Sequence, residues 1–379
     1  MRAAPTGFPR KRGAPFAPVA LPPANRPDFL RMTSVSSPCH GACGGLGNPA
    51  YGATCGRMHN HDPPQVSAPR PLPPGPEVPP RFQAPPWLHD DQGMVRRVGV
   101  EIEFQGITAE AAARALADEL GGTCVEEDPH AFHILDTSIG RLAVELDLRH
   151  VHPQRRAATQ RIRLGATGAA WLGTMLEGVV PRELITAPLP IGELDCVDRA
   201  VDVLRAAGAR GLGATRFGSL GLHFNIDPPS LDADAVTAVL KAFLLLSPNL
   251  RQDAAGPSAA FQSAPYPDSY VRRVVDPGYW PDLPALAEDY LSANPTRDRD
   301  LDLLPLFLHL DPAQVRERLP HEKIGSRAVF HYRLPRAFVS DPAWSIAAAW
   351  NGWVSVEQLA DDRPRLDALG RQHRSIGSA

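Results

Sequence analysis

The sequence has no run of 18 or more apolar residues, so it offers no obvious membrane span. It has only five cysteines in 379 residues, an odd number that favours a reducing compartment over a disulfide-stabilised fold. A formal net charge of −3 gives no basic field for nucleic acid or for an anionic membrane. Neither a Walker-type phosphate loop nor a dinucleotide-binding glycine fingerprint is present. We therefore expect a cytoplasmic protein that spans no membrane and binds no nucleic acid.

Proline is in excess at the N-terminal end, where many of the 41 prolines lie. Proline removes backbone donors and favours an extended, solvated chain. We expect 1–86 to be a disordered Pro/Gly-rich tail, 95–360 to form the folded domain and 361–379 to be a C-terminal tail. Met94 and the earlier Met58 are alternative translation starts that would shorten or remove the first tail.

Cysteine and histidine gather in the N-terminal tail with a spacing that matches no compact zinc motif. We interpret this group as low-complexity sequence rather than as a metal site. Its members are Cys39, His40, Cys43, Cys55, His59 and His61.

Strand and helix patterns interleave after residue 95. Apolar residues alternate with glycine and glutamate over 96–104, which predicts a strand, and Thr108 is placed to cap a following helix that ends at Gly121. The irregular order favours an α+β fold with a curved, mostly antiparallel sheet backed by helices. Further strands are predicted over 124–126, 141–148, 179–185, 220–226 and 328–334, and helices over 165–176, 194–204, 236–246, 285–291 and 343–359. The helix after Asp232 is expected to end at Ser247-Pro248, and 265–280 is either a loop over a site or ordinary packing.

Acidic residues occur at alternate positions of two predicted strands. Glu101 and Glu103 share one face of the first strand, because residues i and i+2 point the same way. Glu145 and Asp147 repeat the arrangement further along. One such pair is usually the solvent face of an edge strand, but a repeated pair favours a charged site that holds a cation.

Two later segments extend the pattern. Glu183 opens a strand that ends at a proline turn, and His223, Asn225 and Asp227 share one face of another strand. Hard oxygen ligands suit magnesium, and magnesium held by several carboxylates usually brings nucleotide phosphates. Positive charge for those phosphates could come from two arginines near the last predicted strand, Arg327 and Arg333.

The order of these motifs resembles the bacterial amidoligase family, which is grouped with glutamate–cysteine ligases and glutamine synthetases among the carboxylate–amine ligases. The resemblance rests on Gly-Val-Glu-Ile-Glu-Phe at 99–104, Glu-Leu-Ile-Thr-Ala-Pro-Leu at 183–189, Gly-Leu-His-Phe-Asn at 221–225 and the late strand ending in Arg333. It covers roughly residues 95–360. It departs from the family where His331 stands two residues before the arginine, a position at which family members often carry glutamate.

The resemblance implies a concave site for ATP and Mg²⁺ on the sheet. By resemblance, Glu101, Glu103 and Glu183 would hold the metal. Nucleotide phosphates would be bound by His223, Asn225 and Arg333, and the catalytic set would be Arg333, His223 and Arg327.

The activity implied is ATP-dependent joining of a carboxylate to an amine through an acyl-phosphate. The substrates would be small-molecule or peptide acids and amines, and a glutamine-amidotransferase-like partner is implied by the family. Two alternatives remain open. A metal-dependent hydrolase would use the same acids and His223 to activate water, and a catalytically silent member would bind metal or peptide only.

Overall fold

The computed structural model describes residues 80–148, 151–152, 165–176, 178–212, 220–255 and 263–376. Most of the predicted proline-rich tail, with its cysteine and histidine group, lies outside these residues.

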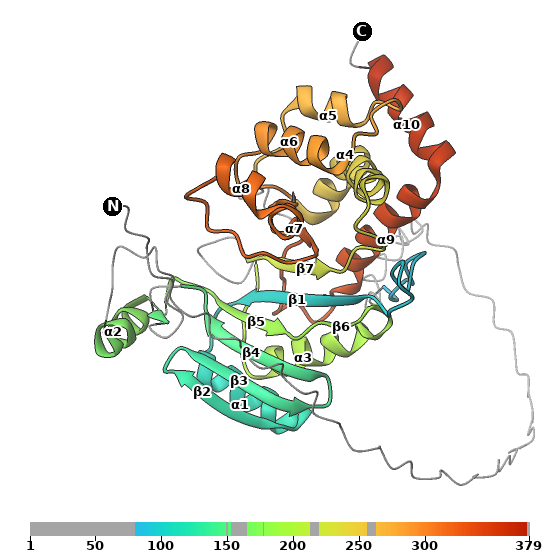
Figure 1. Cartoon of the computed structure of the whole chain (residues 1–379). Coiled ribbons are helices and arrows are strands. Elements are labelled where there is room, and N and C mark those ends of the chain that lie inside the picture. Colours follow the sequence, from blue (N-terminus) through green and yellow to red (C-terminus); the bar gives the residue numbers. More distant parts are fainter. Residues whose placement is uncertain are drawn as a thin grey trace, which may run out of the picture. The chain divides into compact units, whose positions relative to one another are not determined.

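A sheet of nine strands organises the described part of the chain (Figure 1). The strands are β1 Arg97–Phe104, β2 Thr123–Asp128, β3 Ala131–Thr137, β4 Gly140–Leu146, β5 Arg182–Thr186, β6 Leu189–Pro190, β7 Leu222–Ile226, β8 Leu301–Asp302 and β9 Phe330–Tyr332. Their order is β2-β3-β4-β5-β1-β7-β9-β8, with β6 also paired to β1. Each of these pairings is antiparallel. The predicted α+β class with a mostly antiparallel sheet is confirmed.

Strand β1 lies in the middle of the sheet and has one apolar face. Its apolar side chains are fully buried, whereas Glu101 and Glu103 on the other face are half-buried. Burying each large apolar side chain stabilises the fold by about 1.5–3 kcal/mol, so the alternation fixes which face of β1 meets the core. The buried residues of this strand are Val98, Val100, Ile102 and Phe104.

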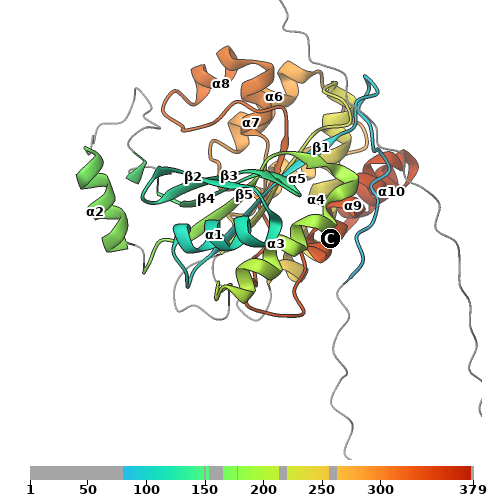
Figure 2. The ribbon, with the colours of Figure 1, turned by 90° about the horizontal axis from the view of Figure 1, so that it is seen from below.

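Helices cover the apolar face of the sheet. Helices α1, Ala109–Leu120, and α3, Asp195–Ala206, contact each other, and α1 packs on β3 and β4 (Figure 2). As predicted, Thr108 caps α1 by accepting a hydrogen bond from the Ala111 amide at 3.1 Å. On the same face, at the other end of the sheet, α9 at Ala347–Asp361 contacts side chains of β7 and β9 through its tryptophans. The opposite face of the sheet is therefore left to polar side chains.

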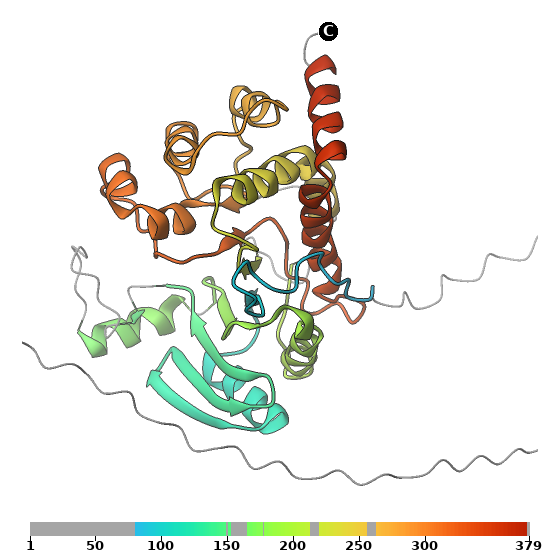
Figure 3. The same cartoon turned by 45° about the vertical axis from the view of Figure 1, so that its right-hand side comes forward.

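The remaining helices are mostly C-terminal. They are α2 Ala166–Leu176, α4 Ala233–Ala255, α5 Asp268–Val274, α6 Leu283–Ala293, α7 Leu304–Leu310, α8 Pro312–Arg318 and α10 Arg363–Ile376. Figure 3 shows α10 following α9 at the C-terminal end of the described chain. Both helices pack against α4.

Helix α4 does not end at Ser247-Pro248, as the sequence had predicted, but continues to Ala255. A proline inside a helix costs about 3 kcal/mol because it removes one hydrogen bond and crowds the preceding turn. Burial of Leu250 against α9 offsets this cost, since only 7% of Leu250 is exposed and it approaches Gly352.

By length and composition, α4 is the single helix among the described residues that could cross a membrane. Half of its most apolar window is buried inside the protein, and it packs against α9 and α10. It also carries a buried lysine, Lys241. These are features of a core helix.

The sequence patterns missed or misplaced several helices and strands. Strand β3 was not predicted, and the predicted strands over 179–185 and 328–334 are shorter in the structure. The described part of 361–379 is the helix α10, with Leu366 buried, so the prediction of a tail there is wrong. The aromatic segment 265–280 contains α5 and packs into the core through Tyr266 and Tyr270.

Candidate functional site

Three glutamates form a row across the polar face of the sheet. Antiparallel register places Glu183 of β5 opposite Glu103 of β1 on one side and opposite Glu145 of β4 on the other. Directly opposed residues in a sheet have their side chains about 5 Å apart and on the same face. Three carboxylates therefore lie side by side where like charges repel each other.

A second group lies one step along β1. Glu101 is opposite His223 of β7, and its carboxylate accepts a hydrogen bond from the Asn225 amide at 2.8 Å. The His223 Nδ1 atom is 3.3 Å from Glu101 Oε2. The register continues from Asn225 to His331 of β9 and from His331 to Asp302 of β8.

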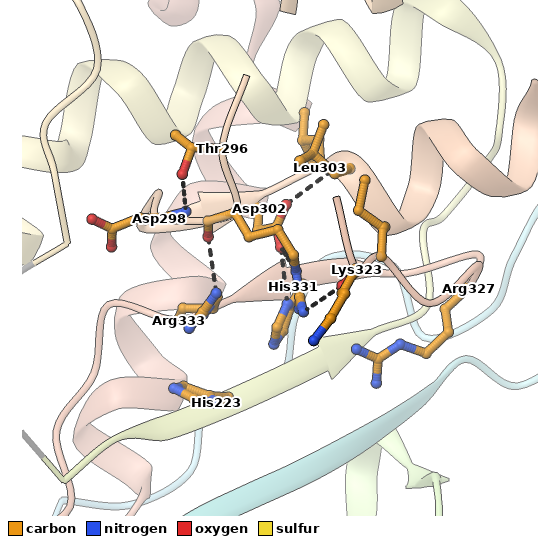
Figure 4. Close-up of polar contacts among 12 residues, drawn as sticks. His223, Thr296, Asp298, Asp302, Leu303, Lys323, Arg327, His331 and Arg333 are labelled. Carbon is orange, nitrogen blue, oxygen red and sulfur yellow. Dashed lines mark hydrogen bonds and ion pairs between the residues drawn. The ribbon is translucent and has the colours of Figure 1, made fainter. Parts of the chain in front are cut away.

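His331 lies at the centre of this second group. Its Nε2 is 3.9 Å from Glu101 Oε2, and its Nδ1 is 3.5 Å from Asp302 Oδ2. It is 2% exposed, and among the described residues neither ring nitrogen lies within good hydrogen-bond geometry of a partner. Figure 4 shows His331 between His223 and Asp302. Glu101, His223 and His331 offer three ligand atoms that all lie within 4.8 Å of one another.

Both groups face one pocket of about 500 Å³. Its positively charged side chains come from the segments before β8 and around β9, where Arg327 approaches Glu101 at 3.4 Å and Arg297 approaches Asp302 at 3.2 Å. Arg333 donates to the Arg297 carbonyl at 2.9 Å (Figure 4). The lining residues are Glu101, Glu103, Glu145, Asp147, Leu148, His152, Glu183, His223, Arg297, Gly325, Arg327, His331 and Arg333.

The two glutamates at the centre of the pocket differ in their ease of ionisation. Burial raises the pKa of Glu183 well above its ordinary value, and the charges of Glu101, Asp147, Glu103 and Glu145 raise it further. Burial also opposes ionisation of Glu101, but the hydrogen bond and charge of its histidine and arginine neighbours outweigh burial and lower its pKa. A carboxyl whose pKa is raised by neighbouring carboxylates marks a place where negative charge is in excess.

Burial lowers the pKa of one histidine of the pocket, whereas hydrogen bonds raise the pKa of another. Desolvation lowers the pKa of His331 to about 4, so its ring is neutral at neutral pH. One nitrogen of a neutral imidazole can then offer its lone pair to a ligand, and the other can donate its proton in a hydrogen bond. His152 is also desolvated, but its hydrogen bonds to Asp128 and to the Leu146 carbonyl, both 2.9 Å, raise its pKa.

The structure brings together most of the site residues expected from the sequence. Those lining the pocket are Glu101, Glu103, Glu145, Asp147, Glu183, His223, Arg327 and Arg333. Asn225 reaches the site through Glu101. Asp227 does not, since its carboxylate accepts a hydrogen bond from the Arg97 amide at the other end of β1. No residue of the aromatic segment 265–280 lines this pocket.

Three contributors were missed in the sequence. His152 follows β4 by a few residues. The sequence feature that could have identified it is the acidic strand that ends shortly before this histidine. Arg297 and Asp302 stand in an Arg-Asp-Arg-Asp-Leu-Asp run whose charges resemble an ordinary surface loop. Only the pairing of β8 with β9 brings them beside His331.

The family comparison agrees with this arrangement. A model described as "Putative amidoligase enzyme" matches residues 94–355, which is well over half of the chain. The chain belongs to the amidoligase family. The match begins just before β1 and ends within α9, so it covers every strand of the pocket in this amidoligase. No curated protein and no solved structure shows significant similarity to it.

Proposed function

We propose that this amidoligase joins a carboxylate to an amine at the expense of ATP, with Mg²⁺ as cofactor. The observation that carries the proposal is the convergence of Glu101, Glu103 and Glu183 with His223 and Arg333 on one pocket. These residues come from three strands, β1, β5 and β7, and from the position after β9, and a solvent-facing edge strand would not explain such a gathering.

The donor set of the pocket fits a hard divalent cation. The row of Glu145, Glu183 and Glu103 offers carboxylate oxygens, which magnesium prefers. Burial and the charges of the neighbouring carboxylates raise the pKa of Glu183, so a bound cation would favour its ionised form. Bound there, Mg²⁺ would hold nucleotide phosphates and offset their charge.

The chain's own residues would orient the reactants and balance charge. A substrate carboxylate would attack the γ-phosphate of ATP, giving ADP and an acyl-phosphate, and an amine would then displace phosphate to form the amide. Arg333 and Arg327 lie at the pocket wall, where a guanidinium can bind two oxygens of the transferring phosphoryl group. His223 lies between the strands of the acids and the arginines and would bind a phosphate oxygen or position the substrate.

The test is release of ADP from ATP by the full chain with Mg²⁺ and pooled acids and amines. Glu103→Gln keeps the shape of the side chain and its ability to accept the hydrogen bond of the Gly221 amide at 2.8 Å, but removes the charge. We expect this variant to lower ADP release by about 100-fold or more, as the loss of a charge-stabilising group in an active site does.

The matched control is Glu110→Gln on the exposed face of α1, where Glu110 pairs with Arg114. Its activity should equal that of the parent. Equal ADP release by the Glu103 variant and the parent would remove Glu103 from the metal site. Turnover of an amide or ester without ATP would instead favour a metal-dependent hydrolase, a reaction that the Glu101–His223–His331 group would also suit.

A further inference from the structure

The group formed by Glu101, His223 and His331 differs in chemistry from the row of glutamates beside it. Two of its three donors are imidazoles. Imidazole nitrogen suits zinc and other first-row transition ions, whereas magnesium prefers an all-oxygen shell.

From these contacts we infer that Glu101, His223 and His331 form a separate site for a divalent first-row transition ion, distinct from a magnesium position on the glutamate row. Its use in catalysis rests on the proposed function, but binding of the ion does not.

The spacing of the donor atoms fits such an ion. Ligand atoms about 2.0–2.2 Å from a tetrahedral metal lie roughly 3.4 Å from one another. In the structure, Glu101 Oε2 is 3.3 Å from His223 Nδ1 and 3.9 Å from His331 Nε2. The ligand nitrogens of His223 and His331 lie within 4.8 Å of each other, so a bound ion would shorten this third side of the triangle by up to about 1.4 Å. The fourth position would face the pocket, because all three residues line it.

The surroundings of His331 are those of a metal ligand. A buried nitrogen without a hydrogen bond costs about 1–3 kcal/mol, and among the described residues Nε2 of His331 has no hydrogen-bond partner, while Nδ1 has only a long contact to Asp302. The Nδ1 atom faces the carboxylate of Asp302, which is fully buried and held by the Leu304 amide at 3.0 Å and by Arg297. A carboxylate behind a histidine fixes the tautomer and orients the other nitrogen towards the metal. A buried histidine that served only in packing would not require a carboxylate behind its ring.

The orientation of His223 is fixed from the opposite side by Gly221. A Cβ atom at this position would lie 2.6 Å from His223 Nε2. The ring can approach the backbone only because Gly221 has no side chain, and its Nδ1 then points to Glu101. Both imidazoles are therefore placed before any ion binds.

The test is metal binding by the full chain after chelator treatment, with Zn²⁺, Co²⁺ and Mg²⁺ measured separately by calorimetry and, for Co²⁺, by its visible absorption. Cysteines of the N-terminal tail would confuse the stoichiometry, so all proteins carry Cys39→Ser, Cys43→Ser and Cys55→Ser. We expect one Zn²⁺ or Co²⁺ per chain at this site, bound at least 100-fold more tightly than Mg²⁺.

The decisive variant is His331→Glu, which supplies an oxygen in place of nitrogen. It should weaken Zn²⁺ binding by about tenfold or more and so reduce the ratio of the Zn²⁺ affinity to the Mg²⁺ affinity. His331→Gln, which removes the ligand without adding charge, gives the same loss of Zn²⁺ binding should the glutamate variant fail to fold. Thermal unfolding without metal reports whether each variant is folded. The matched control is His133→Gln on β3, because His133 pairs with Glu127 at 2.9 Å and does not line the pocket.

Two results would overturn the inference. One is Zn²⁺ affinity in the folded His331 variants equal to that of the parent. The other is Mg²⁺ binding by the parent as tight as Zn²⁺ binding. These results are independent of the ligase proposal. If the protein binds Zn²⁺ through His331 but releases no ADP, the metal-site inference stands and the ligase proposal fails. If it releases ADP and the His331 variants bind metal as the parent does, the ligase proposal stands and the metal-site inference fails.

Discussion

The ion pair of Arg96 and Glu357 joins the start of β1 to α9, and both side chains are fully buried. The guanidinium donates two hydrogen bonds to the carboxylate, at 2.6 and 2.9 Å, and others to the carbonyls of Trp87 and Asp227. The same carboxylate accepts a hydrogen bond from Trp353 Nε1 at 2.7 Å. We predict that Glu357→Ala strongly destabilises the folded domain.

The magnitude follows from what the substitution leaves behind. Arg96 remains buried with a full charge and without its paired carboxylate, and Trp353 Nε1 loses its acceptor. Removing one partner of a buried ion pair costs about 3–5 kcal/mol. A loss of about 4 kcal/mol lowers the ratio of folded to unfolded protein by nearly three orders of magnitude, since each ~1.4 kcal/mol is a factor of ten. For a large domain it corresponds to a fall in melting temperature of roughly 8–16 °C.

The assay is urea unfolding at constant pH, with thermal unfolding as a second measure. The control is Glu110→Ala, which breaks the exposed pair of Glu110 and Arg114 on α1 and should cost less than about 0.5 kcal/mol. A loss below about 1 kcal/mol for Glu357→Ala would refute the reasoning, because it would mean that water reaches Arg96 or that the packing relaxes around it.

Three further predictions concern single positions. Gly221→Ala should displace the His223 ring, because the added Cβ lies 2.6 Å from Nε2, and lower ADP release by about 10- to 100-fold; unchanged release would show that the ring position is unimportant. Thr108→Ala removes the cap of α1 and should cost about 1 kcal/mol in urea unfolding, with Thr108→Asn as the variant that retains a cap. Burial lowers the pKa of Lys241 to about 8, so the folded protein gives up this proton before the unfolded chain does, and the free energy of unfolding should gain a rising contribution between about pH 8 and 10.5. Lys241→Met should lack that contribution, and equal pH slopes for parent and variant would contradict the assignment.

Local patterns predicted the framework of the fold because their physical causes are local. The alternation of β1 and the cap at Thr108 depend on residues within one or two turns of the chain, and both appear where expected. Helix α4 was misjudged because Pro248 is a local breaker, whereas the contact that carries the helix past it, Leu250 with α9, joins residues about a hundred positions apart. Strand β3 was missed for a similar reason. It pairs with β2 on one side and with β4 on the other, and an isolated segment does not reveal these partners.

The site residues also fall into those that a local pattern marks and those that only distant strand pairing brings together. Glu101, Glu103 and Glu183 could be found because each lies on a strand whose other face is apolar, so the sequence itself marks them as unusual. The role of His331 could not be judged, because its neighbours come from β1, β7 and β8 and no spacing in the sequence connects them. In the sequence, His331 was only a departure from the resemblance to the family. With Asp302 behind it and, among the described residues, no hydrogen-bond partner for Nε2, it suggests a change of metal.

Charge balance connects these observations. A pocket in which Glu145, Glu183 and Glu103 stand in one row would repel a nucleotide polyphosphate, and the raised pKa of Glu183 shows that the row already resists holding its full charge. Arg327 and Arg333 lie at the wall and do not pair with that row in the described contacts. Cations bound to the carboxylates would remove the repulsion and favour ionisation of Glu183, so cation and nucleotide would each strengthen the binding of the other by the same factor. On this reasoning, under the proposed function, the excess of acid would make the pocket favour a nucleotide that arrives with its metal over one that arrives alone.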